Sequence, residues 1–576
     1  MEAKPFGTSD DPLKKFHDLE YVRPDISLLK KNYKRLIGAF KRAPDLESAK
    51  KLLLRMQELE SDIETTYSIA AIRNTMDTTD TFYDKEIAFF NKALPQLIPT
   101  QKKYLKALLQ SPHRPGLEAE YGSQLFRQAE LDEKTQSIWI LTDKIKESNL
   151  KSAYKKLAAS CKTDFRGEVC NFYGLLKHME SADRNERRES FLAWAGLYEQ
   201  NATKLDELFD KLIAVRVRMA RKLHFDSYTS FAYLNRHRID YTAVDAARFR
   251  DQVRRVVVPA CMRIRERQAA RIGVEKLKYY DETFMFPDGN ADPIGNKDEM
   301  IQEARAMYRE LSPETAEFFD SMVEHELFDL ETRPGKHLGG YCSSLPKYKV
   351  PFIFSNFNGT SADVDVLTHE AGHAFEYYLA SRTQVLAEYA HSTSEINEIH
   401  SMSMEHFTYP WMEKFFGDKA DPYRYAHLCS ALTVIPYLVA VDEFQHRIYE
   451  KPEMSADDRR TVWREIEQIY LPWRDYDGMG YMEKGGFWMQ KQHIFVYPFY
   501  YIEYALAQMG AFAFYGKLKT DRAGAWADYL RLCQAGGSLG YFELLKLANL
   551  PNPFAEGSVE QTVTHVIAEI ESSPWH

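Results

Sequence analysis

Hydrophobic residues recur about every 3.6 positions along most of this chain, which is the pattern of amphipathic helices packed against a core. Two segments, residues 84–94 and 203–223, show such an apolar face with charged residues on the opposite side. Another stripe begins at Leu52 and continues for about five turns through Met56, Leu59, Ile63, Tyr67 and Ala70. We therefore expect a mainly α-helical protein.

One segment departs from the helical pattern. Residues 332–363 read TRPGKHLGGYCSSLPKYKVPFIFSNFNGTSAD, in which glycines and prolines surround the β-prone run PFIFSNF. A run of this kind between turn-forming residues is typical of short strands. We expect a small β-sheet here, immediately before the histidine-containing helix considered below.

Length and charge narrow the class of protein. A chain of 576 residues is too long for one ordinary core, which indicates two to four domains or one large helical body. The net charge of −9 disfavours nucleic acid as the main partner. The weakest boundary lies near residues 180–190, so we predict an N-terminal helical region at 1–185 and a second region at 186–576.

Neither secretion nor membrane insertion is expected from the sequence. The first residues, MEAKPFGTSDDPLKK, contain no apolar signal region. The longest apolar run, Leu428–Val441, is too short to span a bilayer and contains Pro436, so we interpret it as a buried helix. Six cysteines without a CxxC pair are typical of buried thiols in a cytosolic protein. We expect a cytoplasmic protein with no membrane partner.

The segment 365–380, DVLTHEAGHAFEYYLA, contains the main candidate for chemistry. On a helix His369 and His373 lie one turn apart, roughly 6 Å along the axis, so both imidazoles could reach one ion. Glu370 points about 100° away and could reach a water molecule on that ion. Apolar residues flank the motif, and two histidines on a buried helix require partners. The HExxH spacing is typical of zinc peptidases.

A catalytic zinc ion usually takes three protein ligands, so a third one should come from a nearby element. The next helix begins near Ser394 and offers Glu395, Glu398, His400, Glu405 and His406. Periodicity alone does not choose among them. Glu398 is favoured because it follows His373 by 25 residues, which leaves room for the first helix to end and the chain to return. Glu405 shares a face with Glu398 and could orient a ligand.

A tyrosine-rich stripe lies further along the chain. On a helix that starts near Pro498, one face would contain Tyr497, Tyr501, Tyr504 and Gln508. Core packing is the ordinary interpretation of an aromatic stripe. Hydrogen-bond donors for a substrate are the alternative.

The motifs resemble those of the oligoendopeptidase F and thimet oligopeptidase family of zinc metallopeptidases, which are of the gluzincin type. HEAGHAF is followed by EINEIHSMSME and preceded by PFIFSNFNGT. The resemblance extends over nearly the whole chain, because residues 76–90 resemble that family's N-terminal helical region and residues 493–508 resemble its C-terminal catalytic block.

This resemblance implies roles for particular residues. His369, His373 and Glu398 would bind one Zn²⁺ per chain, and Glu370 would be the general base. His493, Tyr497 and Tyr504 match a family histidine and two tyrosines, seven apart, that donate hydrogen bonds to the substrate and the developing oxyanion. The sequence differs from many members between His493 and Tyr497, where IFV replaces a longer, glycine-rich link.

The same resemblance implies a large helical ellipsoid with a deep central channel and a small β-sheet beside the zinc-binding helices. Short peptides would enter this channel, and an edge strand formed by PFIFSNFNG could hold them through backbone hydrogen bonds. The predicted function is therefore a zinc endopeptidase of short oligopeptides, with no prediction of oligomeric state.

Two alternatives remain open from the sequence. A peptidyl-dipeptidase or carboxypeptidase would use the same zinc chemistry, but it would need a positive group for the substrate carboxylate, and the matched motifs do not supply one. A non-catalytic helical scaffold that binds peptides would leave the base, the ligands and the tyrosines without a role.

Overall fold

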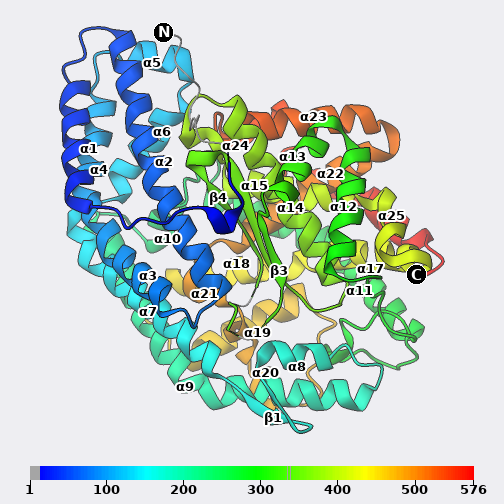
Figure 1. Ribbon diagram of the computed structural model, residues 1–576. Helices are drawn as coiled ribbons and strands as arrows, with labels where there is room; N and C mark the ends of the chain where they lie inside the picture. Colours follow the sequence, from blue (N-terminus) through cyan, green and yellow to red (C-terminus); the bar gives the residue numbers. More distant parts are fainter. Residues whose placement is uncertain (1–12, 334, 338) are drawn as a thin grey trace. The chain divides into compact units, whose positions relative to one another are not determined.

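Helices make up most of the protein, as the hydrophobic period predicts (Figure 1). Among the residues that the structure describes, the strands form one two-stranded and one three-stranded sheet. The computed structural model describes residues 13–333, 335–337 and 339–576. The first twelve residues, for which we expect no secretory signal, lie outside this described part, as do Pro334 and Leu338 of the segment predicted to contain the sheet.

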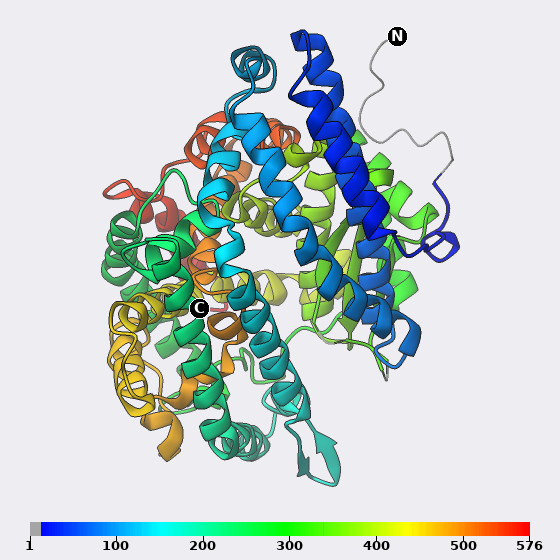
Figure 2. The same cartoon turned by 90° about the vertical axis from the view of Figure 1, so that its left-hand side faces the viewer.

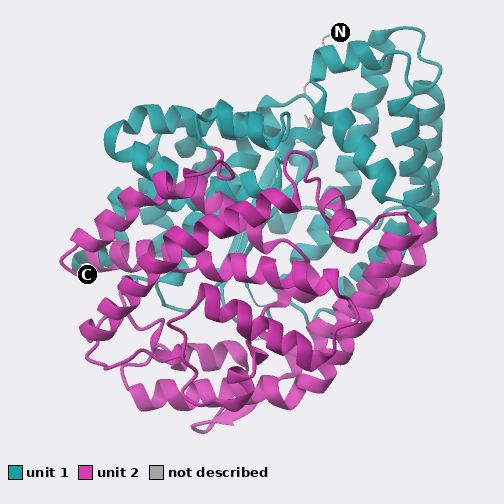
Figure 3. Cartoon of the chain, turned by 180° about the vertical axis from the view of Figure 1, so that it is seen from behind, with its two compact units in different colours: residues 1–138, 292–420, 513–551 teal, residues 139–291, 421–512, 552–576 magenta. Residues whose placement is uncertain are grey.

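The chain forms two compact units, each assembled from three separate segments (Figure 3). Unit 1 contains residues 1–138, 292–420 and 513–551. Unit 2 contains residues 139–291, 421–512 and 552–576. This is a different division from the sequence regions 1–185 and 186–576, which remain a prediction.

Unit 1 begins with a group of packed helices, of which α1 and α2 lie side by side (Figures 1 and 2). The group consists of α1 (Ile26–Phe40), α2 (Leu46–Met76), α3 (Thr81–Ala93), α4 (Ile98–Leu109), α5 (Arg114–Tyr121) and α6 (Gln124–Thr135). Helix α2 contains the predicted apolar stripe, and its Met56 is fully buried in a core shared with Leu53, Leu108 and Phe126. Asp45 caps α2 by accepting a hydrogen bond from the Ser48 backbone N–H.

The three-stranded sheet also belongs to unit 1 and lies in the predicted place. Its strands are β3 (Phe328–Glu331), β4 (Tyr341–Leu345) and β5 (Val350–Phe357). The order β3-β5-β4 makes β5 the central strand, parallel to β3 and antiparallel to β4. The prediction that PFIFSNFNG forms an edge strand is therefore wrong, because both of its sides are already paired. Its almost continuous burial agrees with a central position.

Two helices follow the sheet and provide the metal motif. Helix α14 (Ala362–Thr383) packs on β5, and α15 (Ser394–Phe407) packs along α14. A short turn of 3₁₀ helix, Ala387–Ala390, lies between them. The other helices of unit 1 are α12 (Lys297–Leu311), α13 (Pro313–Glu324), α16 (Glu413–Phe416), α23 (Arg522–Ala535) and α24 (Tyr541–Leu547).

Unit 2 is built around long helices and one hairpin. Its elements are α7 (Leu141–Ser160), β1 (Thr163–Phe165), β2 (Glu168–Cys170), α8 (Phe172–His178), α9 (Arg184–Lys222), α10 (Tyr228–Asn235), α11 (Ala243–Arg271), α17 (Ala420–Thr433), α18 (Ile435–Glu450), α19 (Ala456–Tyr470), α20 (Gly480–Glu483), α21 (Gln492–Val496), α22 (Tyr501–Thr520) and α25 (Ser558–Ser572). Helix α17 begins at the last residue of unit 1, and α22 continues into that unit after Phe512.

The apolar run Leu428–Val441 forms two helices instead of the single one predicted. Helix α17 ends at Thr433 and α18 begins at Ile435, with Pro436 in the first turn of α18, where its missing N–H breaks no helical bond. Within the described residues, the stretch Glu413–Glu450 passes a length-and-composition test for a membrane-crossing helix, but 72% of its most apolar window is buried inside the protein.

Candidate metal centre

Asp363, in the first turn of α14, ties the start of the helix to the loop before it. Asp363 accepts hydrogen bonds from the backbone N–H groups of Asn358 (3.0 Å to Oδ1) and Gly359 (2.7 Å to Oδ2). These bonds satisfy donors in the loop between β5 and α14, and they place a negative charge at the positive end of the helix dipole. The first turn of α14 is thus joined to the loop that follows β5, and the motif lies further along the same helix.

His369 and His373 lie one helical turn apart on α14, as the spacing predicts. Their ring centroids are 5.0 Å apart, and the rings are nearly perpendicular. Both side chains are partly exposed, at 24% and 21% of their full area. Two imidazoles in this arrangement can each direct one nitrogen to a shared point.

The third member of the group is Glu398 on α15. Its Oε2 atom lies 3.4 Å from Nε2 of His369 and 3.4 Å from Nε2 of His373. The ligand atoms of these three residues all lie within 4.8 Å of one another. Glu398 is buried, and Ser401 Oγ donates a hydrogen bond of 3.1 Å to the same Oε2.

The other ligand candidates on α15 do not belong to this three-residue group. His400 and His406 are buried. Burial lowers the pKa of His400 to about 3, so its ring is neutral. Glu395 is also buried, in the first turn of the helix. Geometry therefore singles out Glu398 among the five candidates that periodicity leaves open.

Close packing of α14 on α15 brings Glu398 to the histidines. A Cβ atom added to Gly372 would lie 2.6 Å from the Ser401 Cα and 2.7 Å from the His400 carbonyl oxygen. The side-chain-free face of Gly372 lets the two helix backbones approach at this point. Tyr529 on α23 donates a hydrogen bond of 2.9 Å to the same His400 carbonyl.

Glu405 has the orienting contact suggested by its place on α15. The Nδ1–H group of His369 donates to Glu405 Oε1, 2.6 Å away. This bond leaves Nε2, the atom that faces Glu398, as the nitrogen available to a ligand. Burial would lower the pKa of His369, but its hydrogen bonds to Glu398 and Glu405 outweigh burial and raise that pKa.

Glu370 lies next to the group without belonging to it. The residue is buried, and burial raises the pKa of its carboxyl group. Its Oε1 atom is 3.7 Å from the position that a Cβ on Gly340 would occupy, so the carboxylate lies against the chain that leads into β4. A carboxylate with a raised pKa beside a metal-type group suits proton transfer near neutral pH.

The donor set fits a divalent transition metal. Two neutral imidazole nitrogens and one carboxylate oxygen are the ligands that catalytic zinc sites use, with one position left for water. The carboxylate bond to His369 Nδ1 is the usual support of such a ligand. Glu398 and Glu405 raise the pKa of His369 and so favour its protonated form. A cation bound between the two imidazoles and Glu398 would take the place of that proton.

The turn between the two ligand helices is fastened to the N-terminal helices of unit 1. The Ala387 backbone N–H donates to Gln57 Oε1 on α2, 2.8 Å away. The Leu125 backbone N–H of α6 donates to the Tyr389 hydroxyl at 2.9 Å. Leu386 and Tyr389 are both buried in the same core as Met56. Sequence patterns did not predict this attachment.

The remaining predicted residues, His493, Tyr497 and Tyr504, lie in unit 2. The His493 ring centroid is 5.9 Å from that of Tyr497 and 6.3 Å from that of Tyr504, so the three form one aromatic group together with Tyr501. Their participation in the same site as the histidines of unit 1 remains a prediction.

The expected single stripe of tyrosines is not formed. Tyr497 follows the end of α21, whereas Tyr501 and Tyr504 lie on α22. Phe499 between them has a φ of +63°, which interrupts the helix. Tyr497 is 48% exposed. The sequence contained a signal for this break, because Tyr497 precedes Pro498 and a residue before proline avoids the helical conformation.

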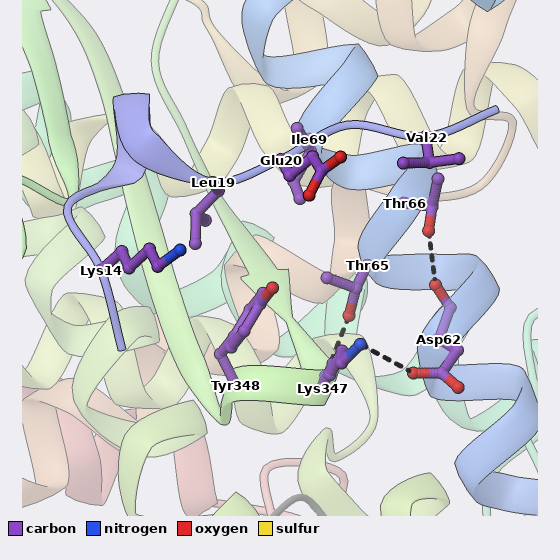
Figure 4. Close-up of a pocket in the computed structure, with 10 residues that line it drawn as sticks. All are labelled: Lys14, Leu19, Glu20, Val22, Asp62, Thr65, Thr66, Ile69, Lys347 and Tyr348. Carbon is purple, nitrogen blue, oxygen red and sulfur yellow. Dashed lines mark hydrogen bonds and ion pairs between the residues drawn. The ribbon is translucent and has the colours of Figure 1, made fainter. Parts of the chain in front are cut away.

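A separate cavity of about 330 Å³ in unit 1 contains none of the predicted site residues (Figure 4). Its polar wall is formed where Lys347 meets α2: Lys347 Nζ lies 3.7 Å from Asp62 Oδ1, and the Lys347 backbone N–H donates to Thr65 Oγ1 at 2.9 Å. The lysine charge is thus already matched by a carboxylate.

An HExxH helix whose histidines meet a carboxylate on the next helix is an arrangement typical of metallopeptidases. The chain belongs to Peptidase family M3. The pattern of that family matches residues 177–563, and the pattern of the Peptidase M3 N-terminal domain matches residues 16–136. The protein is therefore an enzyme, a peptidase, which removes the non-catalytic alternative.

Solved structures agree with this membership. An X-ray structure of a protein described as an oligoendopeptidase F is 48% identical, with a TM-score of 0.94 over 98% of this chain and 99% of that one. PZ peptidase A, solved with an inhibitor, is 45% identical, with a TM-score of 0.93 over 97% of this chain and 100% of that one.

A curated relative is more distant. The Oligoendopeptidase F homolog of Borreliella burgdorferi is 22% identical over 227 residues. This match covers 38% of the present chain and only 37% of the relative's length.

Proposed function

We propose that the protein is a zinc-dependent metalloendopeptidase that hydrolyses internal bonds of short oligopeptides, with one Zn²⁺ in its catalytic centre. The observation that supports this most directly is the approach of Glu398 Oε2 to Nε2 of both His369 and His373, at 3.4 Å each. Similarity to an oligoendopeptidase F and to an inhibitor-bound peptidase supports the same substrate class.

In this proposal His369, His373 and Glu398 hold the ion, and Glu405 keeps His369 in the tautomer that presents Nε2. When bound, zinc would lower the pKa of a water molecule and polarise the scissile carbonyl. Glu370 would accept the proton of the attacking water and deliver it to the departing amine nitrogen. The burial that raises the pKa of Glu370 makes its carboxylate a stronger base for this transfer.

Charge that develops on the substrate oxygen requires hydrogen-bond donors in addition to the ion. We assign this role to His493 and Tyr504, with Tyr497 as a weaker contributor because it lies off α22 and is half exposed. The clustering of His493 with Tyr504 inside unit 2 supports a shared task.

An extended peptide would bind along β4, which is the edge of the sheet next to Glu370. Backbone hydrogen bonds to an edge strand depend little on side-chain identity, which suits substrates of varied sequence. We therefore propose for β4 the peptide-binding role that the sequence predicted for β5.

We also propose that the protein acts in the cytoplasm. Its six cysteines are free thiols, five of them buried, as expected where thiols stay reduced.

A mixed peptide library tests the proposal. Incubation with the zinc-loaded enzyme should give products cut at internal bonds, and chelator should abolish them until Zn²⁺ is restored. Peptides with an amidated C-terminus separate this function from the exopeptidase alternatives, because an endopeptidase cleaves them as well as the free acids. Loss of cleavage on amidation would favour a peptidyl-dipeptidase or carboxypeptidase, and activity unchanged by exhaustive metal removal would refute the zinc mechanism.

A further inference from the structure

A second group of metal-type ligands lies in unit 2, at the β1-β2 hairpin and the helix α8 that follows it (Figure 1). Ligand atoms of Glu168, Cys170 and His178 all lie within 4.8 Å of one another. The catalytic group of unit 1 meets the same geometric condition. Glu168 and Cys170 lie between the two ranges of the chain that match the family, 16–136 and 177–563.

The hairpin places two of the ligands on one face. Glu168 and Cys170 are two positions apart on β2, so their side chains point to the same side. Their cross-strand partners on β1 are Phe165 and Thr163. A tight turn at Arg166 and Gly167, both with positive φ, joins the strands.

Helix α8 brings the third ligand to that face. Asn171 caps the helix by accepting hydrogen bonds from the backbone N–H groups of Tyr173 and Gly174, each 3.0 Å long. Gly174 and His178 lie one turn apart. A Cβ on Gly174 would lie 3.3 Å from Cys170 Sγ, so this face of α8 is pressed against the thiol. The Phe165 ring centroid lies 4.8 Å from that of His178.

The carboxylate of Glu186 orients the His178 ring through Nδ1. A carboxylate in this position is typical of histidines that bind metal ions, and it is an observation separate from the ligand distances. The Nδ1–H group of His178 donates to Glu186 Oε1 on α9, 2.6 Å away. Glu186 is itself held by Ser181 Oγ at 3.0 Å and by the Arg166 guanidinium at 3.1 Å. The same relationship joins His369 to Glu405 in the catalytic group, and it leaves Nε2 of His178 available.

We propose that Glu168, Cys170 and His178 form a second, structural binding site for a transition-metal ion of the Zn²⁺ class. One thiolate, one imidazole and one carboxylate suit a borderline-soft ion, and water would complete a tetrahedral set. Neighbouring ligand atoms in such a set lie about 3.5 Å apart. The exposed Glu168 side chain can make the required movement. On binding, the Cys170 thiol releases its proton to solvent.

Such an ion would clamp the hairpin onto α8 and the first turn of α9. Three elements that follow one another in the sequence would then be joined by one set of strong bonds. Structural metal ions commonly stabilise segments of this size. The site lies outside the peptidase centre, so it adds a second metal requirement that is independent of catalysis.

Cobalt substitution tests the proposal, because the hairpin group contains a cysteine and the catalytic group does not. Full-length protein freed of metal by chelation is titrated with Co²⁺ alone. We expect two Co²⁺ per chain and a near-ultraviolet thiolate-to-cobalt charge-transfer band. C170S should lose this band and keep one Co²⁺. The matched control C261S, which changes another buried thiol of unit 2, should keep both the band and two Co²⁺.

The variant H369A provides a second test, which does not depend on the folding of C170S. H369A weakens the catalytic group, so it should still bind one Co²⁺ with the charge-transfer band, and Zn²⁺ should raise its thermal midpoint. H178A should weaken this site at least tenfold. A wild-type protein that saturates with one Co²⁺, that binds two without a thiolate band, or whose band persists in C170S would overturn the proposal.

Discussion

Gly372 of α14 lies directly against Ser401 of α15, so closely that a Cβ atom on the glycine would be 2.6 Å from the Ser401 Cα. Atoms of the backbone cannot move aside as the end of a flexible side chain can. The approach of these two residues therefore sets the separation of the helices and, with it, the distance from Glu398 to both histidines.

Replacing Gly372 by alanine should push α14 and α15 apart. We expect G372A to lose about 1–3 kcal/mol of stability and to bind zinc at least tenfold more weakly. Thermal unfolding and zinc content measure the two effects. G38A is the matched control, because a Cβ there meets nothing closer than the Arg42 side chain at 3.6 Å, and this helical change should be neutral or stabilising. Normal zinc affinity in G372A would contradict this account of the glycine.

Glu370 and Glu376 lie on the same helix and differ in their expected roles. E370Q should lower kcat by about 10²–10⁴-fold and keep its zinc, because only proton transfer is removed. Burial keeps the pKa of Glu376 well above its ordinary value, so this residue is a neutral acid that glutamine resembles. E376Q should therefore keep most of its turnover. Equal losses in the two variants would show that changing either buried carboxyl group of α14 disables the enzyme, and would contradict a special role for Glu370.

Removal of the Glu405 carboxylate should act through His369. In E405Q the 2.6 Å bond to Nδ1 loses its charge, and we expect zinc affinity to fall about 10–100-fold. Competition with a zinc-binding dye measures this change. Excess Zn²⁺ should restore most of the turnover, which distinguishes a positioning residue from the base. Unrestored activity at full zinc occupancy would contradict the assignment.

The donors proposed in unit 2 can be ranked by removing single hydroxyl groups. Y504F should lower kcat by about 10²–10³-fold with little change in zinc content, because it removes one hydrogen bond to the developing oxyanion. Y497F, at the half-exposed position off α22, should have a smaller effect. Steady-state kinetics on one peptide compare the two. A larger loss in Y497F would reverse the ranking.

A pair of carboxyl groups in unit 1 makes stability depend on pH. Burial raises the pKa of Glu388 to about 8, helped by the nearby Glu60, whose pKa burial raises to about 7. An unfolded glutamate titrates near pH 4.3, so from about pH 5 to 8 the folded state holds protons that the unfolded chain has released. Stability from this pair is complete below about pH 4 and falls as the pH rises through 7 and 8.

E388Q stays neutral and should lose less stability over that range. We expect thermal midpoints near those of the wild type at pH 5 and a few degrees higher at pH 8. E453Q, which alters an exposed glutamate of unit 2, should follow the wild type at both values. If the thermal midpoint changes by the same amount between pH 5 and 8 in the wild type, E388Q and E453Q, the carboxyl pair is not the cause of the pH dependence.

Local patterns in the sequence predicted the parts of this fold that depend on local interactions. The stripe of α2, the small sheet and the HExxH helix all follow from periodicity and turn residues. The strand order did not, because the central place of β5 depends on β3 and β4 returning to its two sides. Spacing together with the family resemblance selected Glu398, whereas the contact of Gly372 with Ser401 involves two helices and leaves no periodic signal.

The turn at Ala387–Ala390 is attached to Gln57 and Leu125. This attachment matters when the chain is shortened to the range that matches the peptidase family. A recombinant fragment starting at residue 177 would still contain both histidines and Glu398 in its sequence. It would lack Gln57 and Leu125, which lie some 260 to 330 positions before the turn between α14 and α15. Both residues form hydrogen bonds to that turn. The amino-terminal third of the chain therefore supports the turn between α14 and α15.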